Sequence, residues 1–287
     1  SASKLDQFAG CRYAFFLQYG MRAAPWKQAE FDAPLFGTFV HDVLEHVVRE
    51  AQEQGGFAAM TDGEISALTE RCMDNCMKTY LPQGQAAASR ESYLSARNRQ
   101  EAAAVVMDVA RELRLSQFAP AAEELRFAPG GPLPPIEYRA KTGSGLLTGQ
   151  IDRVDTYEAD GRRYFRIIDY KTGHKDFDYA ELLYGKNLQM LLYLFALESY
   201  QRRAGTPMQP AGVLYVPGRC DMVKLKPGED PAQADAERQK DLRRKGLLLN
   251  DEVVLHAMEA YEKKPQYLPF APGPDGLIGD LASPAQL

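Results

Sequence analysis

Two aspartates and a lysine lie close together in residues 149–171, which read GQIDRVDTYEADGRRYFRIIDYK. Side chains alternate between the two faces of a strand, so Asp169 and Lys171 point the same way and Tyr170 points away. Two neighbouring carboxylates, here Asp152 and Asp169, repel each other unless a cation lies between them, and hard divalent ions prefer oxygen ligands. A lysine beside such an ion can hold an attacking water or stabilise charge on a phosphate. The pattern therefore suits metal-dependent cleavage of a phosphodiester.

The two runs that carry these residues are predicted to form a β-hairpin. Asp160-Gly161 is a turn signal between two stretches of strand-like alternation. The hairpin would bring Asp152 near the end of one strand and Asp169 near the end of the next. Aspartates and lysines at strand ends are more commonly solvated or in weak surface pairs. The chemical interpretation therefore depends on partners supplied by other elements.

Two predicted helices carry such partners. Residues 36–54 have an apolar stripe of helical spacing, and His41 lies in this helix. A lone helical histidine is more often a surface residue than a ligand. Residues 185–203 form a second predicted helix directly after the hairpin, with Gln189 and Tyr193 at i and i+4 on one face. Both helices could direct polar side chains toward the acidic hairpin.

The remaining patterns predict an α/β core in which helices flank a mixed β-sheet, with a helical insertion before the sheet. The further expectations are helices over 63–81, 91–118 and 251–264, strands over 121–127, 136–140 and 211–216, a polar loop over 172–184, and a tail over 265–287 with little regular structure. The charged stretch that ends in RQKDLRRKG is either a DNA-backbone contact or a solvated face.

Composition limits the class of protein. The 287 residues are 45% hydrophobic and carry a net charge of −5, so DNA binding would need a local basic groove. No apolar run is long enough to span a bilayer and no signal-peptide pattern is present, which predicts a soluble cytoplasmic protein without a membrane partner. The four cysteines do not suggest a disulfide framework, and Cys72 and Cys76 are better explained as buried thiols than as a metal pair. The chain starts without Met, which suggests an excised fragment of a larger protein.

Six residues in four motifs, in order, resemble the RecB-type motifs of the PD-(D/E)XK nuclease superfamily. They are His41 in GTFVHDVLE, Asp152 in GQIDRVD, Asp169 and Lys171 in DYKTG, and Gln189 with Tyr193 in QMLLY. The resemblance implies a restriction-endonuclease-like fold and one nuclease domain over 1–287. Its helical portion would cover about 56–118, its catalytic core about 36–54 plus 121–216, and its tail 265–287. The residues 1–20 and the stretch RRKGLLLND are similar to the C-terminal nuclease domains of AddB-type helicase–nuclease subunits.

The resemblance also implies roles for single residues. Metal ligands for Mg²⁺ or Mn²⁺ would be His41, Asp152, Asp169 and the backbone carbonyl of Tyr170. Lys171 would orient the nucleophilic water or stabilise the transition state. Gln189 and Tyr193 would position the site and the DNA backbone, and Glu124, in the sequence ELRF, would assist a second ion.

A further implication concerns Cys11. AddB-type domains resemble nucleases that hold a [4Fe–4S] cluster with one cysteine near the start and three close together after the core. Cys11 matches the first, and no cysteine follows Cys220. Four thiolates are needed for such a cluster, so we expect it in the parent protein and not in this fragment.

The leading hypothesis is a metal-dependent deoxyribonuclease, running as an exonuclease on single-stranded or unwound DNA in double-strand break repair and recombination. No Walker A loop is present, so unwinding would come from a helicase partner subunit of AddA type. Two alternatives remain open. One is a stand-alone RecB-like exonuclease from a phage or a CRISPR locus, and the other is a non-catalytic DNA-binding scaffold with a decayed site.

Overall fold

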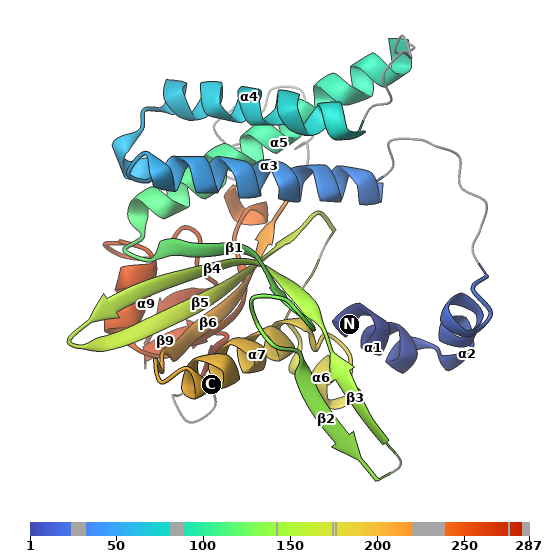
Figure 1. Ribbon diagram of the computed structural model, residues 1–287. Helices are drawn as coiled ribbons and strands as arrows, with labels where there is room; N and C mark the ends of the chain where they lie inside the picture. The colour runs from blue at the N-terminus through green and yellow to red at the C-terminus, as the bar shows by residue number, and fades with distance from the viewer. Residues whose placement is uncertain are drawn as a thin grey trace.

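A mixed six-stranded β-sheet lies at the centre of the computed structural model, which describes residues 1–23, 33–80, 89–141, 143–173, 175, 177–219, 239–274 and 276–282 (Figure 1). The strand order is β1-β4-β5-β6-β7-β10. Their bounds are β1 Ala119–Phe127, β4 Gly149–Ala159, β5 Arg162–Lys171, β6 Gln209–Pro217, β7 Lys245–Leu249 and β10 Leu281–Ala282. Pairing is antiparallel except for β5 with β6 and β7 with β10, which are parallel. The predicted α/β class with a mixed sheet is confirmed.

Three long helices form a layer on one side of the sheet, and one helix covers the other face (Figure 1). The first group is α3 Ala33–Glu53, α4 Asp62–Tyr80 and α5 Ser89–Leu115, and the opposite helix is α7 Gln189–Arg203. Strand β5 shows why both faces need cover: Ile168 packs into the helical layer of α3 to α5, whereas Phe165 and Ile167 pack toward α7. Alternating side chains of one strand thus belong to two hydrophobic cores. The predicted helical portion before the sheet is present as η2 Phe57–Ala59, α4 and α5.

The predicted hairpin is formed by β4 and β5. Asp160 and Gly161 both have positive φ angles, 51° and 73°, as a two-residue hairpin turn requires. The strands remain in register from Ala159↔Arg162 to Arg153↔Ile168. Beyond that point β5 continues beside β6 to the end of the strand. The end of β5 that carries the Asp-Tyr-Lys sequence therefore lies in the middle of the sheet.

Several predicted boundaries after Lys171 were wrong. The expected loop over 172–184 contains a short helix, α6 Tyr179–Leu183. The expected helix over 185–203 begins only at Gln189, because Gly185 and Asn187 have positive φ angles, which an α-helix does not accommodate. The helix expected over 251–264 ends at Met258, as α9 Glu252–Met258.

The tail was also predicted incorrectly. It contains a β-hairpin, β8 Phe270–Gly273 with β9 Gly276–Gly279, and strand β10, which pairs with β7 at the edge of the main sheet. Strand β7 itself was not predicted. Residues 220–238, which include Cys220 and most of the charged stretch 227–246, lie outside the described residues.

Smaller elements surround the core. The N-terminal group is α1 Ala2–Gly10, α2 Arg12–Phe15 and the π-helix η1 Phe16–Gly20, and the hairpin of β2 Ile136–Ala140 with β3 Gly143–Leu147 projects from the sheet directly before β4 (Figure 1). Within the described residues, no helix combines the length and the apolar character needed to cross a membrane.

Candidate active site

The site forms where β4 and β5 separate. Their ladder ends at Arg153↔Ile168, and beyond it the backbone N–H of Tyr170 donates a hydrogen bond to Asp152 Oδ2 at 2.7 Å. The carboxylate of Asp152 therefore accepts the hydrogen bond that a backbone carbonyl of β4 would accept if the ladder continued. The separation leaves the ends of both strands open toward the first long helix.

Helix α3 contributes His41 to this opening. Its Nε2 atom lies 2.9 Å from the carbonyl oxygen of Tyr170, and its Nδ1 atom lies 3.5 Å from Asp152 Oδ2. A Cβ atom added at Gly37, one turn earlier, would lie 3.2 Å from Thr172 Oγ1. Glycine thus lets this turn of α3 approach the end of β5 closely. The apolar stripe that buries the helix consequently directs His41 at the separated strands.

Glu124 enters from the other neighbour of β4. The register of β1 with β4 places it opposite Asp152, between the pairs Glu123↔Arg153 and Leu125↔Ile151. Its φ angle is +48°, a left-handed conformation that disfavours residues with a Cβ atom by roughly 1–2 kcal/mol. Strain of this kind inside a strand is typical of functional positions.

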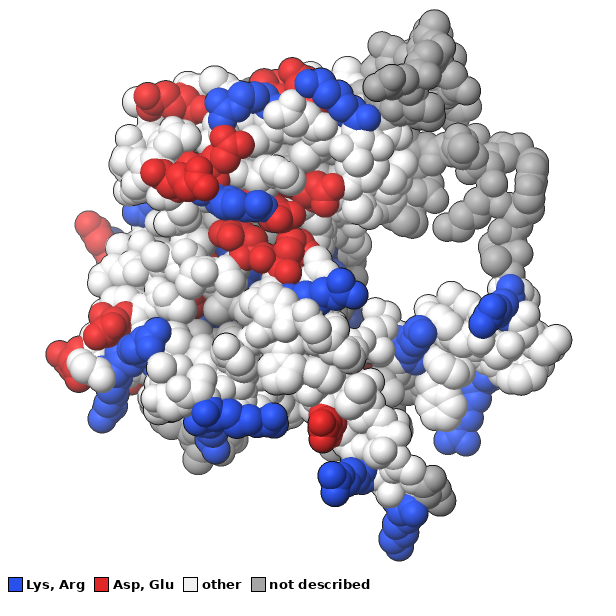
Figure 2. Space-filling model, viewed as in Figure 1, with Lys and Arg blue, Asp and Glu red and all other residues white. Residues whose placement is uncertain are grey.

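One group of potential metal ligands therefore converges from three elements. One ligand atom each of His41, Glu124 and Asp152 lies within 4.8 Å of the others. The amide of Gln150 donates a hydrogen bond to Glu124 Oε2 and holds that carboxylate in place. Figure 2 shows acidic side chains gathered where the helical layer meets the sheet. Glu124 therefore lies beside two of the other predicted ligands, and its role toward a second ion stays a prediction.

Asp169 lies next to this group and is almost fully buried, with 1% of its surface exposed. Gln189 Nε2 donates hydrogen bonds of 2.8 Å to Asp169 Oδ1 and to the hydroxyl oxygen of Tyr193. Lys171 Nζ forms an ion pair with Asp169 Oδ2. The structure thus brings together the residues that the hairpin and the helix after it were predicted to supply.

Burial and mutual repulsion control the ionisation of these groups. Burial raises the pKa of Asp152 well above its usual value, and the nearby charge of Asp169 raises it further. Burial also raises the pKa of Asp169, against the opposing effect of Lys171. The pKa of Glu124 is raised by burial, and burial lowers the pKa of His41, which favours the neutral imidazole that can bind a metal.

The residues present fit a hard divalent cation. Three carboxylates, those of Glu124, Asp152 and Asp169, face one ammonium group, that of Lys171, in a largely buried space. Among the described residues, the Lys171 ammonium is the partner of Asp169 Oδ2, and this oxygen accepts no other hydrogen bond. Oxygen atoms with one imidazole nitrogen are suitable ligands for Mg²⁺ or Mn²⁺.

Two contributors to the site were not predicted. Gln150 fixes Glu124, and Gly149 leaves room for Tyr193, because an added Cβ atom would lie 3.0 Å from Tyr193 Cε1 and 2.5 Å from Phe127 Cζ. A sequence signal did exist, since a glycine inside a strand often marks a close approach of neighbours. Which neighbour approaches became clear only in the fold.

Cys11 is not part of this arrangement. It is exposed, and its Sγ atom accepts a weak hydrogen bond from Ala14 N at 3.5 Å at the start of α2. Cys72 and Cys76 are buried in α4, as predicted, within the helical layer. The cysteines of the described residues therefore do not fit a four-thiolate iron–sulfur cluster.

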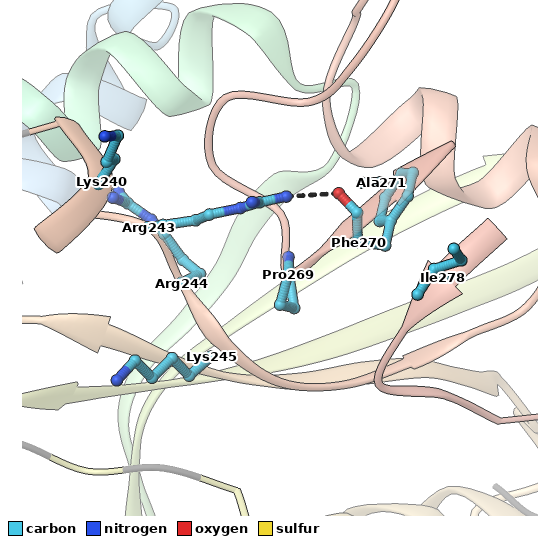
Figure 3. A pocket seen from close by; sticks show the side chains of 8 residues that line it. All are labelled: Lys240, Arg243, Arg244, Lys245, Pro269, Phe270, Ala271 and Ile278. Atoms are coloured by element: carbon cyan, nitrogen blue, oxygen red, sulfur yellow. Dashed lines mark hydrogen bonds between the residues drawn. The ribbon is translucent and has the colours of Figure 1, made fainter. Parts of the chain in front are cut away.

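Part of the basic stretch near Lys245 has a structural role. It lines a surface pocket with Pro269, Phe270 and Ile278 (Figure 3). Arg243 lines this pocket and donates hydrogen bonds to the backbone carbonyls of Leu268 and Phe270. Arg244 is buried. A DNA contact and a solvated face were therefore both wrong for Arg244, whereas for partly buried Arg243 the two alternatives stay open.

Comparison with known proteins agrees with this geometry. The family model of the PD-(D/E)XK nuclease superfamily matches residues 1–268. The chain belongs to this superfamily. Its mixed sheet carries the acidic site, which lies between α3, β4 and β5.

Its relatives include long proteins that are named as ATP-dependent helicase/deoxyribonuclease subunits of the B type. The chain is 31% identical over 284 residues to the one from Thermoanaerobacter sp. (strain X514), an alignment that covers 97% of this chain and 24% of the relative. The proteins of the same name from Acetivibrio thermocellus and Clostridioides difficile are 31% and 29% identical, over 100% and 99% of this chain and 25% of each relative. The chain thus spans about a quarter of the length of these curated relatives.

Proposed function

We propose that this chain is a metal-dependent deoxyribonuclease that hydrolyses DNA phosphodiester bonds. The observation that carries the proposal is the convergence of His41, Glu124 and Asp152 beside the Asp169–Lys171 pair, in a member of a nuclease superfamily. The ion would be Mg²⁺ or Mn²⁺. Its ligands would be His41, Asp152, Asp169 and the carbonyl oxygen of Tyr170, and Glu124 would assist a second ion.

The residues of the chain divide the chemistry among them. A bound divalent ion supplies Lewis-acid stabilisation of the phosphate and an activated water. Lys171, whose ammonium group pairs with Asp169, would hold that water or stabilise negative charge that develops on the phosphate. Gln189 orients Asp169, and Tyr193 supports Gln189 from one turn along the same helix. Neutral His41 offers a nitrogen ligand.

We further propose that the chain is the nuclease portion of an AddB-type subunit. The names of the relatives support this role, since each is called a helicase/deoxyribonuclease subunit. An AddA-type helicase subunit would supply unwound DNA, and the nuclease would digest one strand as an exonuclease in double-strand break repair and recombination. Exposed Cys11 would be the N-terminal ligand of an iron–sulfur cluster only in the full-length protein.

The test is cleavage of end-labelled single-stranded DNA with Mg²⁺ or Mn²⁺, in parallel with EDTA. We expect the wild type to cut only with metal. Lys171→Ala should lose cleavage while Mn²⁺ binding, measured by calorimetry, remains, because the ammonium acts beside the ion and is not a ligand. Asp152→Ala should lose both cleavage and binding, because a ligand is removed.

Glu158→Ala is the matched control, since Glu158 lies on the same hairpin but is exposed near its turn. This variant should cut as the wild type does. Equal cleavage by the wild type, Lys171→Ala and Asp152→Ala would refute the proposed site. DNA binding without any cleavage by the wild type would favour a scaffold.

A further inference from the structure

A network of buried charges lies beneath the candidate site, on the side of the sheet that faces α5. Three arginines and three carboxylates take part, and each side chain has at most 6% of its surface exposed. The members are Asp108, Glu112, Arg153, Asp155, Arg166 and Arg244. Opposite charges are equal in number, so the network is internally neutral. Buried charges are retained only when they are paired.

One end of this network reaches the site through a tyrosine. Arg153 Nη1 donates a hydrogen bond of 2.6 Å to the hydroxyl oxygen of Tyr170, and its Nε and Nη2 atoms donate to Asp155 at 2.7 Å and 3.0 Å. Asp155 also accepts a hydrogen bond of 2.8 Å from Arg166 Nε. The guanidinium of Arg153 is thereby fixed from both sides.

Tyr170 connects this network with the ligands. Its side chain points into the helical layer, whereas its backbone N–H bonds to Asp152 and its carbonyl oxygen lies 2.9 Å from His41 Nε2. The β4–β5 ladder has already ended at this point, although β5 still pairs with β6. On the β4 side, the N–H and the carbonyl oxygen of Tyr170 therefore contact the side chains of Asp152 and His41 instead of strand backbone. The backbone of Tyr170 thus contacts both ligand residues, Asp152 through its N–H and His41 through its carbonyl oxygen.

We propose that Arg153 and the side chain of Tyr170 have a positioning role: they hold the Tyr170 backbone in the orientation that aligns His41 and Asp152 for metal binding. The proposal rests on the proposed metal-dependent function. It assigns a role to Arg153, directly after Asp152, whose guanidinium donates hydrogen bonds to Asp155 and to the Tyr170 hydroxyl. The interaction is specific, because the planar guanidinium of Arg153 bonds to Asp155 and to the Tyr170 hydroxyl at the same time.

The critical variant is Tyr170→Phe, which removes only the hydroxyl group that Arg153 holds. We expect Mn²⁺ affinity, measured by calorimetry, to fall about tenfold, as for other residues that support metal ligands. The kcat for cleavage of single-stranded DNA should fall similarly, while KM for DNA stays at the wild-type value. Arg153→Lys, which keeps the charge but not the planar fork, should change metal affinity in the same direction.

Tyr164→Phe is the matched control, since Tyr164 lies on the same strand, packs into the same core and is 5% exposed. It should bind Mn²⁺ and cleave DNA as the wild type does. Wild-type Mn²⁺ affinity and kcat in both Tyr170→Phe and Arg153→Lys would overturn the inference. Equal losses in Tyr164→Phe would overturn it too, because general packing would then be responsible. A wild-type protein that neither binds Mn²⁺ nor cuts DNA would instead refute the proposed function.

Discussion

Replacing Glu112 by glutamine should destabilise the whole domain through the buried charge network. Glu112 is 0% exposed and accepts hydrogen bonds from Arg244 Nε and Nη2 at 2.9 Å and 2.7 Å, and Arg166 Nη2 lies 3.3 Å from its other oxygen. Burial by itself would raise the pKa of Glu112, but the charges of Arg244 and then Arg166 and Arg153 outweigh it and lower the pKa from 4.5 to about 2.

Two independent estimates give the loss in the free energy of unfolding that Glu112→Gln should cause. A pKa lowered to about 2 corresponds to about 3 kcal/mol of stability at neutral pH. Removal of one partner of a buried ion pair typically costs about 3–5 kcal/mol. For a chain of this length, a loss of about 3 kcal/mol lowers Tm by roughly 5 °C. We therefore expect Glu112→Gln to lower Tm by at least that amount at pH 7.

The pH dependence provides the sharper measurement. Because the folded-state pKa of Glu112 is depressed, its contribution is fully present above the unfolded value of 4.5 and is lost as the pH falls toward about 2. The difference in the free energy of unfolding between wild type and Glu112→Gln should therefore shrink between pH 4.5 and 2. Urea unfolding followed by circular dichroism at several pH values measures it.

Glu198→Gln is the control for this experiment, because Glu198 pairs with exposed Arg202 one turn away on α7. Such a surface pair contributes about 0.3–0.5 kcal/mol, so little change is expected. The reasoning would be refuted if Glu112→Gln were as stable as the wild type at pH 7. It would equally be refuted if the difference between the two proteins did not depend on pH below 4.5.

Two further predictions concern packing and thiol reactivity. Gly149→Ala should lower stability by about 1–3 kcal/mol and slow DNA cleavage, because its Cβ atom would collide with Phe127 and displace Tyr193; thermal unfolding and cleavage rates measure this, and wild-type values would contradict it. Burial raises the pKa of Cys72 to about 12 and that of Cys76 to about 11, so at pH 8 on the order of one thiol in a thousand or fewer is ionised. Iodoacetamide should therefore label both far more slowly in the native protein than in urea, as mass spectrometry would record. The stability that these protonated thiols contribute is present below about pH 9 and is lost as the pH rises above it.

The sequence alone determined much of the local structure and the main polar residues of the site. The Asp160-Gly161 turn and the alternation around it specify the hairpin, and a hairpin necessarily places Asp152 and Asp169 on neighbouring strands. The apolar stripe of α3 likewise specifies a buried helix with His41 at its edge. These features depend on the period of side chains along a strand or helix, which residues close in sequence establish.

Other features depended on the tertiary structure. Strand β10 pairs with β7, which lies more than 30 residues earlier, and its two residues carry no periodic pattern that could indicate a strand. Gly185 and Asn187 are residue types that tolerate positive φ angles, but only the fold shows that both adopt them and that α7 therefore begins at Gln189. The short helix α6 lies just before them, in a stretch whose composition indicates a loop. Elements this short form only when neighbouring parts of the fold stabilise them.

The buried charge network is the clearest case. Asp108 and Arg244 lie 136 positions apart and make a hydrogen bond of 2.5 Å, yet each by itself is indistinguishable in sequence from a solvated surface charge. The sequence determines which charges exist, because that is a matter of residue type. Only the fold decides which of them lose their water, since burial depends on how α5, the hairpin and β7 pack against one another. A buried charge is stable only when an opposite charge pairs with it. The ion pairs that satisfy this requirement form a continuous network from the centre of the sheet to the candidate site.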